Sequence, residues 1–130
     1  MRWQLVIPLA LAGVAFGVLT VAAWIHGYEG TIALLLLTSI GGIVALLEQH
    51  RPVRNGFGAG FFASISAVAM QVLFFDTYMT NNPDYLNTDI PFGLSPIVYT
   101  LSFAPIGGLI GGLLAALTAW LVARVRKATG

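Results

Sequence analysis

Four long apolar stretches, separated by short polar segments, make up most of the chain. They cover residues 3–25, 31–47, 57–75 and 96–123, and none of them contains Lys, Arg, Asp or Glu. A helix needs about 20 mainly apolar residues to cross a bilayer. The stretches are continuously apolar rather than alternating, which favours helices over barrel strands. The pattern predicts an all-α protein, a single domain over residues 1–130, folded as a four-transmembrane-helix bundle with a long loop at 76–95.

The fourth apolar stretch is the longest, and Pro105 lies within it. As one helix it would span roughly 40 Å, more than a hydrocarbon core of about 30 Å. Either the helix tilts and kinks at Pro105, or residues 91–104 form an interfacial segment and the span begins near Pro105. We expect the kink. The first stretch resembles a signal peptide, with Val21-Ala22-Ala23 as an acceptable cleavage pattern, but it is longer than a usual signal core, so we expect a retained helix.

The chemical composition places the chain in lipid. Its residues are 58% hydrophobic and only 8% charged, whereas soluble domains carry about 25% charged residues. The chain has no cysteine, which excludes disulfides and thiolate chemistry. A net charge of +1 gives no case for nucleic acid, and no phosphate-binding glycine loop occurs. We therefore expect the bilayer as solvent, no nucleic-acid partner, no cofactor and no metal site.

Basic residues lie on only one side of the predicted bundle. With four spans, both termini and the 48–56 loop share a side, and that side carries every Lys and Arg: Arg2, Arg51, Arg54, Arg124, Arg126 and Lys127. Such asymmetry predicts that both termini are cytoplasmic. We expect a bacterial or archaeal cytoplasmic (inner) membrane.

The loop "EQHRPVRNG", residues 48–56, has two interpretations. In the first it is a cytoplasmic turn, in which Pro52 stops a helix and Asn55-Gly56 form the turn. In the second, Glu48, His50 and the two arginines form a cluster that binds an anionic headgroup or shuttles protons. The turn is favoured, because positive-inside anchoring already explains the arginines.

Small residues occur on a face of every predicted span. The glycines at helix-packing spacing are Gly13, Gly17, Gly41, Gly42, Gly56, Gly60, Gly107, Gly108, Gly111 and Gly112. Glycines let helix backbones approach closely in lipid. They serve either internal packing or docking onto another subunit, and both uses stay open for the fourth span. The repeated Ile-Gly-Gly at 40–42 and 106–108 also suggests two tandem helical hairpins.

Polar side chains at membrane depth are few. Ser64, Ser66 and Thr100 belong to a class that commonly bonds to its own helix. Gln71 cannot satisfy its amide alone, so we expect it to bond across to another helix, towards Thr100 or Ser102. The alternative roles for these four polar residues are ligand contact or the lining of a pore.

The outer loop is the most individual segment, and Tyr78, Asp84, Tyr85 and Asp89 are its candidate docking residues. It is either a solvated cap over the bundle or a surface that binds an outer partner. At the preceding turn, His26 and Glu29 have the spacing of two metal ligands. Two ligands do not complete a site, so we interpret them as a polar turn.

Residues 55–85 contain "GFGAGFF" and, further on, "NNPDY". This pattern resembles a family of small four-helix bacterial membrane proteins known as domain of unknown function 4199. The resemblance covers about a quarter of the chain and implies no activity, because the family has none established.

The chain offers much packing surface and little chemistry. We therefore expect a non-catalytic accessory or structural subunit that packs against protein partners in a larger membrane complex. The alternative is a small homo-oligomeric channel or transporter with Gln71, Ser64, Ser66 and Thr100 along its pore. An enzyme is the least favoured class, since no nucleophile–base pair or metal-ligating constellation occurs in the sequence.

Overall fold

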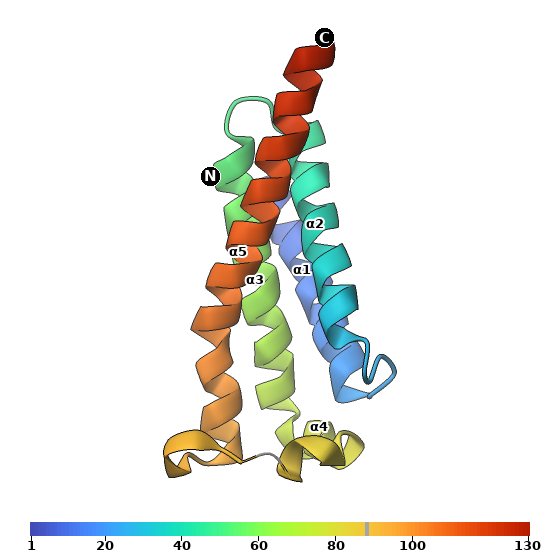
Figure 1. Ribbon diagram of the computed structural model, residues 1–130, viewed down its shortest axis with the longest axis vertical. Coiled ribbons are helices and arrows are strands. Elements are labelled where there is room, and N and C mark those ends of the chain that lie inside the picture. Colours follow the sequence, from blue (N-terminus) through green and yellow to red (C-terminus); the bar gives the residue numbers. More distant parts are fainter. Residues whose placement is uncertain (88) are drawn as a thin grey trace.

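The computed structural model describes residues 1–87 and 89–130, and it is built from helices (Figure 1). The elements are α1 (Trp3–Val21), α2 (Glu29–Leu47), α3 (Pro52–Leu73), α4 (Phe75–Asn81), two short 3-10 helices η1 (Pro83–Asn87) and η2 (Pro91–Gly93), and α5 (Pro96–Thr129). The described residues form no strand. Among them, α1, α2, α3 and α5 are long and apolar enough to cross a membrane. This confirms the all-α class and makes the chain an integral membrane protein.

The bundle has two chemically different ends. Both termini and the α2–α3 connection lie at one end, here called the terminal end (Figure 1). The α1–α2 turn, α4 and η1 lie at the opposite end, here called the loop end. Every Lys and Arg therefore lies at the terminal end.

One boundary expectation was wrong. Pro52 does not stop a helix but starts α3, and Asn55 and Gly56 lie inside the first turns of that helix. Proline suits the first helical position, because its missing N–H has no intrahelical partner there. For the fourth span, the alternative that was not favoured, a span beginning near Pro105, is wrong, since α5 is one helix from Pro96 through Pro105 to Thr129.

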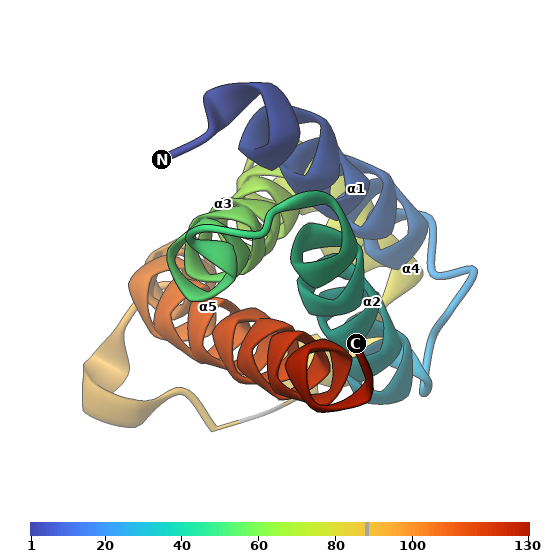
Figure 2. The ribbon, with the colours of Figure 1, turned by 90° about the horizontal axis from the view of Figure 1, so that it is seen from above.

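The helix α3 is the centre of the packing. It packs most extensively against α5 and α1, and it lies between them when viewed along the bundle (Figure 2). By contrast, α1 and α2 touch each other little, although they are consecutive in the chain. The expected division into two tandem hairpins does not describe this packing.

Most of the glycines allow close contact between helices within the chain. Those with atoms of another helix near the position of an added Cβ are Gly13, Gly17, Gly41, Gly56, Gly60, Gly108, Gly111 and Gly112. At Gly17, for example, a Cβ would lie 2.7 Å from the Cβ of Met70. Gly42 and Gly107 have nothing within 4 Å of that position. The small residues of α5 are thus largely used for packing inside this chain.

Candidate functional site at the loop end

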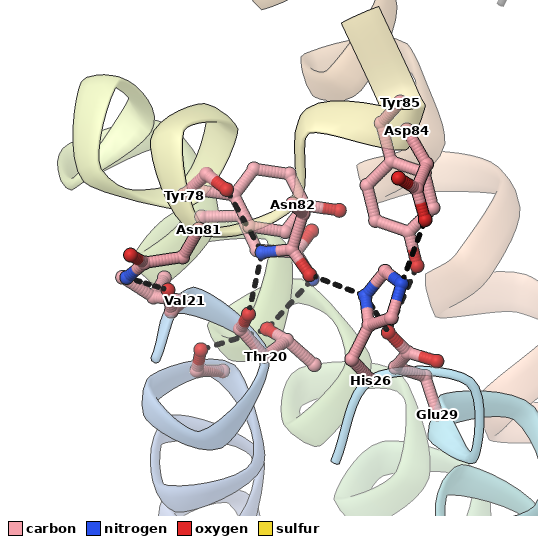
Figure 3. A network of polar contacts seen from close by, with 11 residues as sticks. Thr20, Val21, His26, Glu29, Tyr78, Asn81, Asn82, Asp84 and Tyr85 are labelled. Atoms are coloured by element: carbon pink, nitrogen blue, oxygen red, sulfur yellow. Dashed lines mark hydrogen bonds and ion pairs between the residues drawn. The ribbon is translucent and has the colours of Figure 1, made fainter. Parts of the chain in front are cut away.

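A network of polar side chains joins the turn after α1 to α4 and η1 (Figure 3). At its centre, His26 Nδ1 lies 2.8 Å from Asn82 Oδ1, and His26 Nε2 lies 2.9 Å from Asp84 Oδ2. Glu29 is the first residue of α2, and its Oε1 lies 3.7 Å from His26 Nδ1. We call His26, Asn82 and Asp84 the histidine latch, because they tie segments that are more than 50 residues apart in sequence.

The backbone of the α1–α2 turn brings His26 towards η1. Gly27 has φ of +84°, a conformation that glycine adopts without a Cβ clash. Ala23 has φ of +57°, which costs an L residue about 1–2 kcal/mol. The hydrogen bonds of the network offset this local strain.

Asn82 organises the latch and is fully buried, with 0% of its surface exposed. Its Nδ2 donates to the Thr20 carbonyl at 3.0 Å and to the Tyr78 carbonyl at 2.8 Å. The Thr20 carbonyl belongs to the last turn of α1 and also accepts a hydrogen bond from the Ala23 backbone N–H at 3.1 Å. Because its nitrogen serves these two carbonyls, the amide presents only its oxygen to His26.

The latch is satisfied by a cationic histidine. Nδ1 faces the amide oxygen of Asn82 and Nε2 faces the carboxylate of Asp84, so both ring nitrogens must donate. Hydrogen bonds to Asn82 first, and then to Asp84, raise the pKa of His26 above its ordinary value. The arrangement therefore suits reversible proton binding coupled to a contact between segments.

Tyr85 extends this network. Its hydroxyl donates to Glu29 Oε1 at 2.8 Å, and its ring lies 5.7 Å from that of His26. Burial, followed by the bond to Glu29, raises the pKa of Tyr85, so its hydroxyl remains a donor. The centre of the Tyr78 ring lies 5.9 Å from the centre of the Tyr85 ring. The α1–α2 turn, α4 and η1 thus form one connected cap.

A crevice lies beneath this cap. Its outer part has a volume of about 350 Å³ and a lining that includes Gln71, Tyr78, Tyr85, Tyr99, Thr100 and Phe103. Its deeper part has a volume of about 160 Å³ and a nearly apolar lining that includes Gly13, Phe16, Leu36, Ser64, Gln71, Phe103 and Gly107. The two parts share Gln71 and Phe103, and together we call them the loop-end crevice. It exists because α5 lies beside α2 towards the terminal end and diverges from it towards the loop end (Figure 1).

Gln71 makes the expected bond to another helix, but the predicted partner was wrong. Its Nε2 donates to Thr20 Oγ1 of α1 at 3.0 Å. Thr100 instead lines the outer part of the crevice together with Gln71. Ser102 donates to the Tyr99 carbonyl, and Ser66 donates to the Phe62 carbonyl, so both bond to their own helices.

Three of the four outer-loop candidates come together at the cap, namely Tyr78, Asp84 and Tyr85. Asp89 is exposed and takes no part in the hydrogen bonds recorded between described residues. His26 and Glu29 do form a polar turn, and Asp84 joins them. Even so, the described part of the chain contains no group of three His, Cys, Asp or Glu residues arranged to hold a metal ion.

Sequence reasoning missed the role of Asn82. The segment "NNPDY" was noticed as a pattern, but nothing in it distinguishes a buried Asn82 from an exposed Asn81. Comparisons of the chain with protein-family models, curated proteins and solved structures find no match. The resemblance of residues 55–85 to domain of unknown function 4199 stays a prediction.

Proposed function

We propose that the chain is a non-catalytic accessory subunit whose loop-end crevice receives a transmembrane helix of a larger protein partner. The observation that carries this proposal is the combination of the crevice with the first turns of α5. Residues 96–106 of α5 are exposed or half-exposed throughout; Leu101 is 53% exposed and Ile106 is 54% exposed. A partner helix in the crevice would cover this part of α5.

The chemistry of the crevice favours a helix over a lipid tail. Gln71, Tyr99 and Thr100 place polar atoms in its outer part, and an acyl chain could not hydrogen-bond to them. A helix can bring a polar side chain to these groups and can pack against small residues. Gly107 lines the deeper part and has open space around it, which leaves room for a partner side chain.

We further propose that the terminal end faces the cytoplasm of a bacterial or archaeal cell. Support comes from the charges at the two ends, since the loop end carries Glu29, Asp76, Asp84 and Asp89 but no Lys or Arg. Retention of basic residues on the cytoplasmic side is the general rule for bacterial membrane proteins.

The test is extraction in mild detergent, sizing, and mass spectrometry of co-migrating proteins. Gly107→Leu fills the crevice, and Gly42→Leu is the matched control, because neither glycine has an atom within 4 Å of an added Cβ. We expect a larger subunit to travel with the wild type and with Gly42→Leu, and to be lost from Gly107→Leu.

A clean homo-oligomer in the wild type would overturn the accessory proposal and favour the channel alternative. Ion flux through reconstituted protein, compared between wild type and Gln71→Leu, would then be the decisive assay. Equal retention of the partner by both glycine variants would remove the crevice as its binding site.

A further inference from the structure

A basic groove lies at the terminal end, between the α2–α3 connection and the last turns of α5. Its volume is about 360 Å³, and its lining is Gln49, His50, Pro52, Val53, Trp120, Ala123, Arg124 and Lys127. Two permanent cations come from α5 and a histidine comes from the connection. No carboxylate belongs to this described lining. The groove is therefore a place of positive potential with an aromatic wall.

The one acidic residue at this end is already engaged. Glu48 Oε2 lies 3.6 Å from Arg2 Nη1, and Glu48 Oε1 accepts a hydrogen bond from the His50 backbone N–H at 3.0 Å. That backbone bond is the main cause that lowers the pKa of Glu48. Glu48 lines a smaller neighbouring groove of about 200 Å³ together with Lys127. Its ion pair is with Arg2, and it does not belong to the lining of the basic groove.

The cations of α5 have different tasks. Arg126 Nη1 donates to the carbonyls of Ala45 at 2.9 Å and Leu46 at 3.2 Å, which caps the end of α2. The Arg124 guanidinium lies 5.1 Å from the centre of the Trp120 ring. Within residues 1–87 and 89–130, no ion pair is recorded for Arg124 or Lys127. Fold stability accounts for Arg126, but it leaves Arg124 and Lys127 free to bind an anion.

An apolar surface of α5 leads up to the groove. On α5, Leu117, Leu121 and Val125 are exposed and form an apolar surface that reaches the level of the basic residues. Trp120 belongs to the residue type that concentrates at membrane interfaces. Acyl chains can follow the apolar surface while a headgroup enters the groove.

We propose that this groove binds the phosphate headgroup of an anionic phospholipid. His50, Arg124 and Lys127 surround the phosphate, and Trp120 contacts the glycerol region. Charge-assisted hydrogen bonds from basic side chains are the strong contacts to phosphate oxygens. The site is separate from the loop-end crevice, so it stands whether or not that crevice receives a partner helix.

The test compares lipid retention after reconstitution in mixed phosphatidylglycerol and phosphatidylcholine, followed by native mass spectrometry. The double variant R124Q/K127Q removes two charges from the groove. The control R51Q/R54Q removes two charges from the same end, and neither of its residues lines the groove. Each basic residue in the groove should contribute about fivefold, the ratio that corresponds to about 1 kcal/mol. We expect R124Q/K127Q to lower phosphatidylglycerol retention about 25-fold, and R51Q/R54Q to leave it near the wild-type level.

Three results would overturn the proposal. Equal losses in both double variants would mean diffuse surface attraction rather than a site. No preference of the wild type for phosphatidylglycerol would mean no anionic lipid site. Binding of inorganic phosphate without lipid enrichment would identify a soluble anion as the ligand. If the double variant does not fold, K127Q alone carries the test, because no hydrogen bond or ion pair is recorded for Lys127 with a described residue.

Discussion

Replacement of Asn82 by alanine should open the cap at the loop end. The buried amide of Asn82 donates to the carbonyls of Thr20 and Tyr78 and accepts from His26. Asn82→Ala removes all three bonds and leaves the two carbonyls without this donor. The matched control is Asn81→Ala, because Asn81 lies in the same turn, is exposed, and makes a single bond to the Val21 carbonyl at 2.9 Å.

The magnitude follows from the bonds lost. Two of the three bonds tie Asn82 to another segment, namely those to the Thr20 carbonyl and to His26, whereas the bond to the Tyr78 carbonyl is local to α4. A hydrogen bond contributes about 1 kcal/mol net, so the two bonds between segments contribute about 2 kcal/mol. That energy corresponds to a roughly 30-fold larger open population of the cap. The single bond of Asn81 corresponds to an effect of about fivefold or less, because it is more exposed to water.

Hydrogen exchange followed by mass spectrometry measures this opening directly. The relevant amides are those of Tyr78 and Asn82, which donate to Phe74 and Tyr78 within α4. We expect their exchange to accelerate about 30-fold in Asn82→Ala, while the amides of α3 keep their protection. Equal acceleration in Asn81→Ala and Asn82→Ala would refute the reasoning. Loss of protection throughout α3 would also refute it, because the bundle as a whole would then depend on the latch.

Three further predictions concern packing, pH and the amide of Gln71. Gly60→Ala places a Cβ 2.7 Å from the Cβ of Ala115 on α5. It should therefore lower the free energy of unfolding by about 1–3 kcal/mol relative to Gly42→Ala. Equal unfolding curves of the two variants, followed by tryptophan fluorescence, would contradict this. The hydrogen bond to Asn82 is the first cause that raises the pKa of His26. Protection of the cap should therefore be complete below pH 6.5, the ordinary pKa of histidine, and be lost as pH rises through the raised pKa; a flat profile of exchange, corrected for intrinsic rates, would contradict it. Gln71→Leu removes one interhelical bond and should lower stability by about 0.6 kcal/mol, measured by the same unfolding assay; a loss of several kcal/mol would show that Gln71 does more than this bond.

The sequence alone determined the solvent, the number of spans and the separation of charge between the two ends. Only helices and closed barrels satisfy their backbone groups in lipid, and these continuously apolar runs lack the alternation of barrel strands, so they indicate helices. Boundaries were less certain, as Pro52 illustrates. The same residue type ends one helix and begins another, so proline alone does not say which.

Only the tertiary structure decided which faces meet. A soluble helix shows its buried face by a polar opposite face, but these helices are apolar all round. Gly42 and Gly107 look like the other glycines in sequence, yet open space surrounds both. The hydrogen-bond partner of Gln71 was likewise decided by the tertiary structure. Because α5 diverges from α2 towards the loop end, a crevice opens beside Thr100, and Gln71 bonds to Thr20 of α1 instead. The latch between His26 and Asn82 joins residues 56 positions apart. It forms because helix packing brings the C-terminal end of α1 close to the C-terminal end of α4.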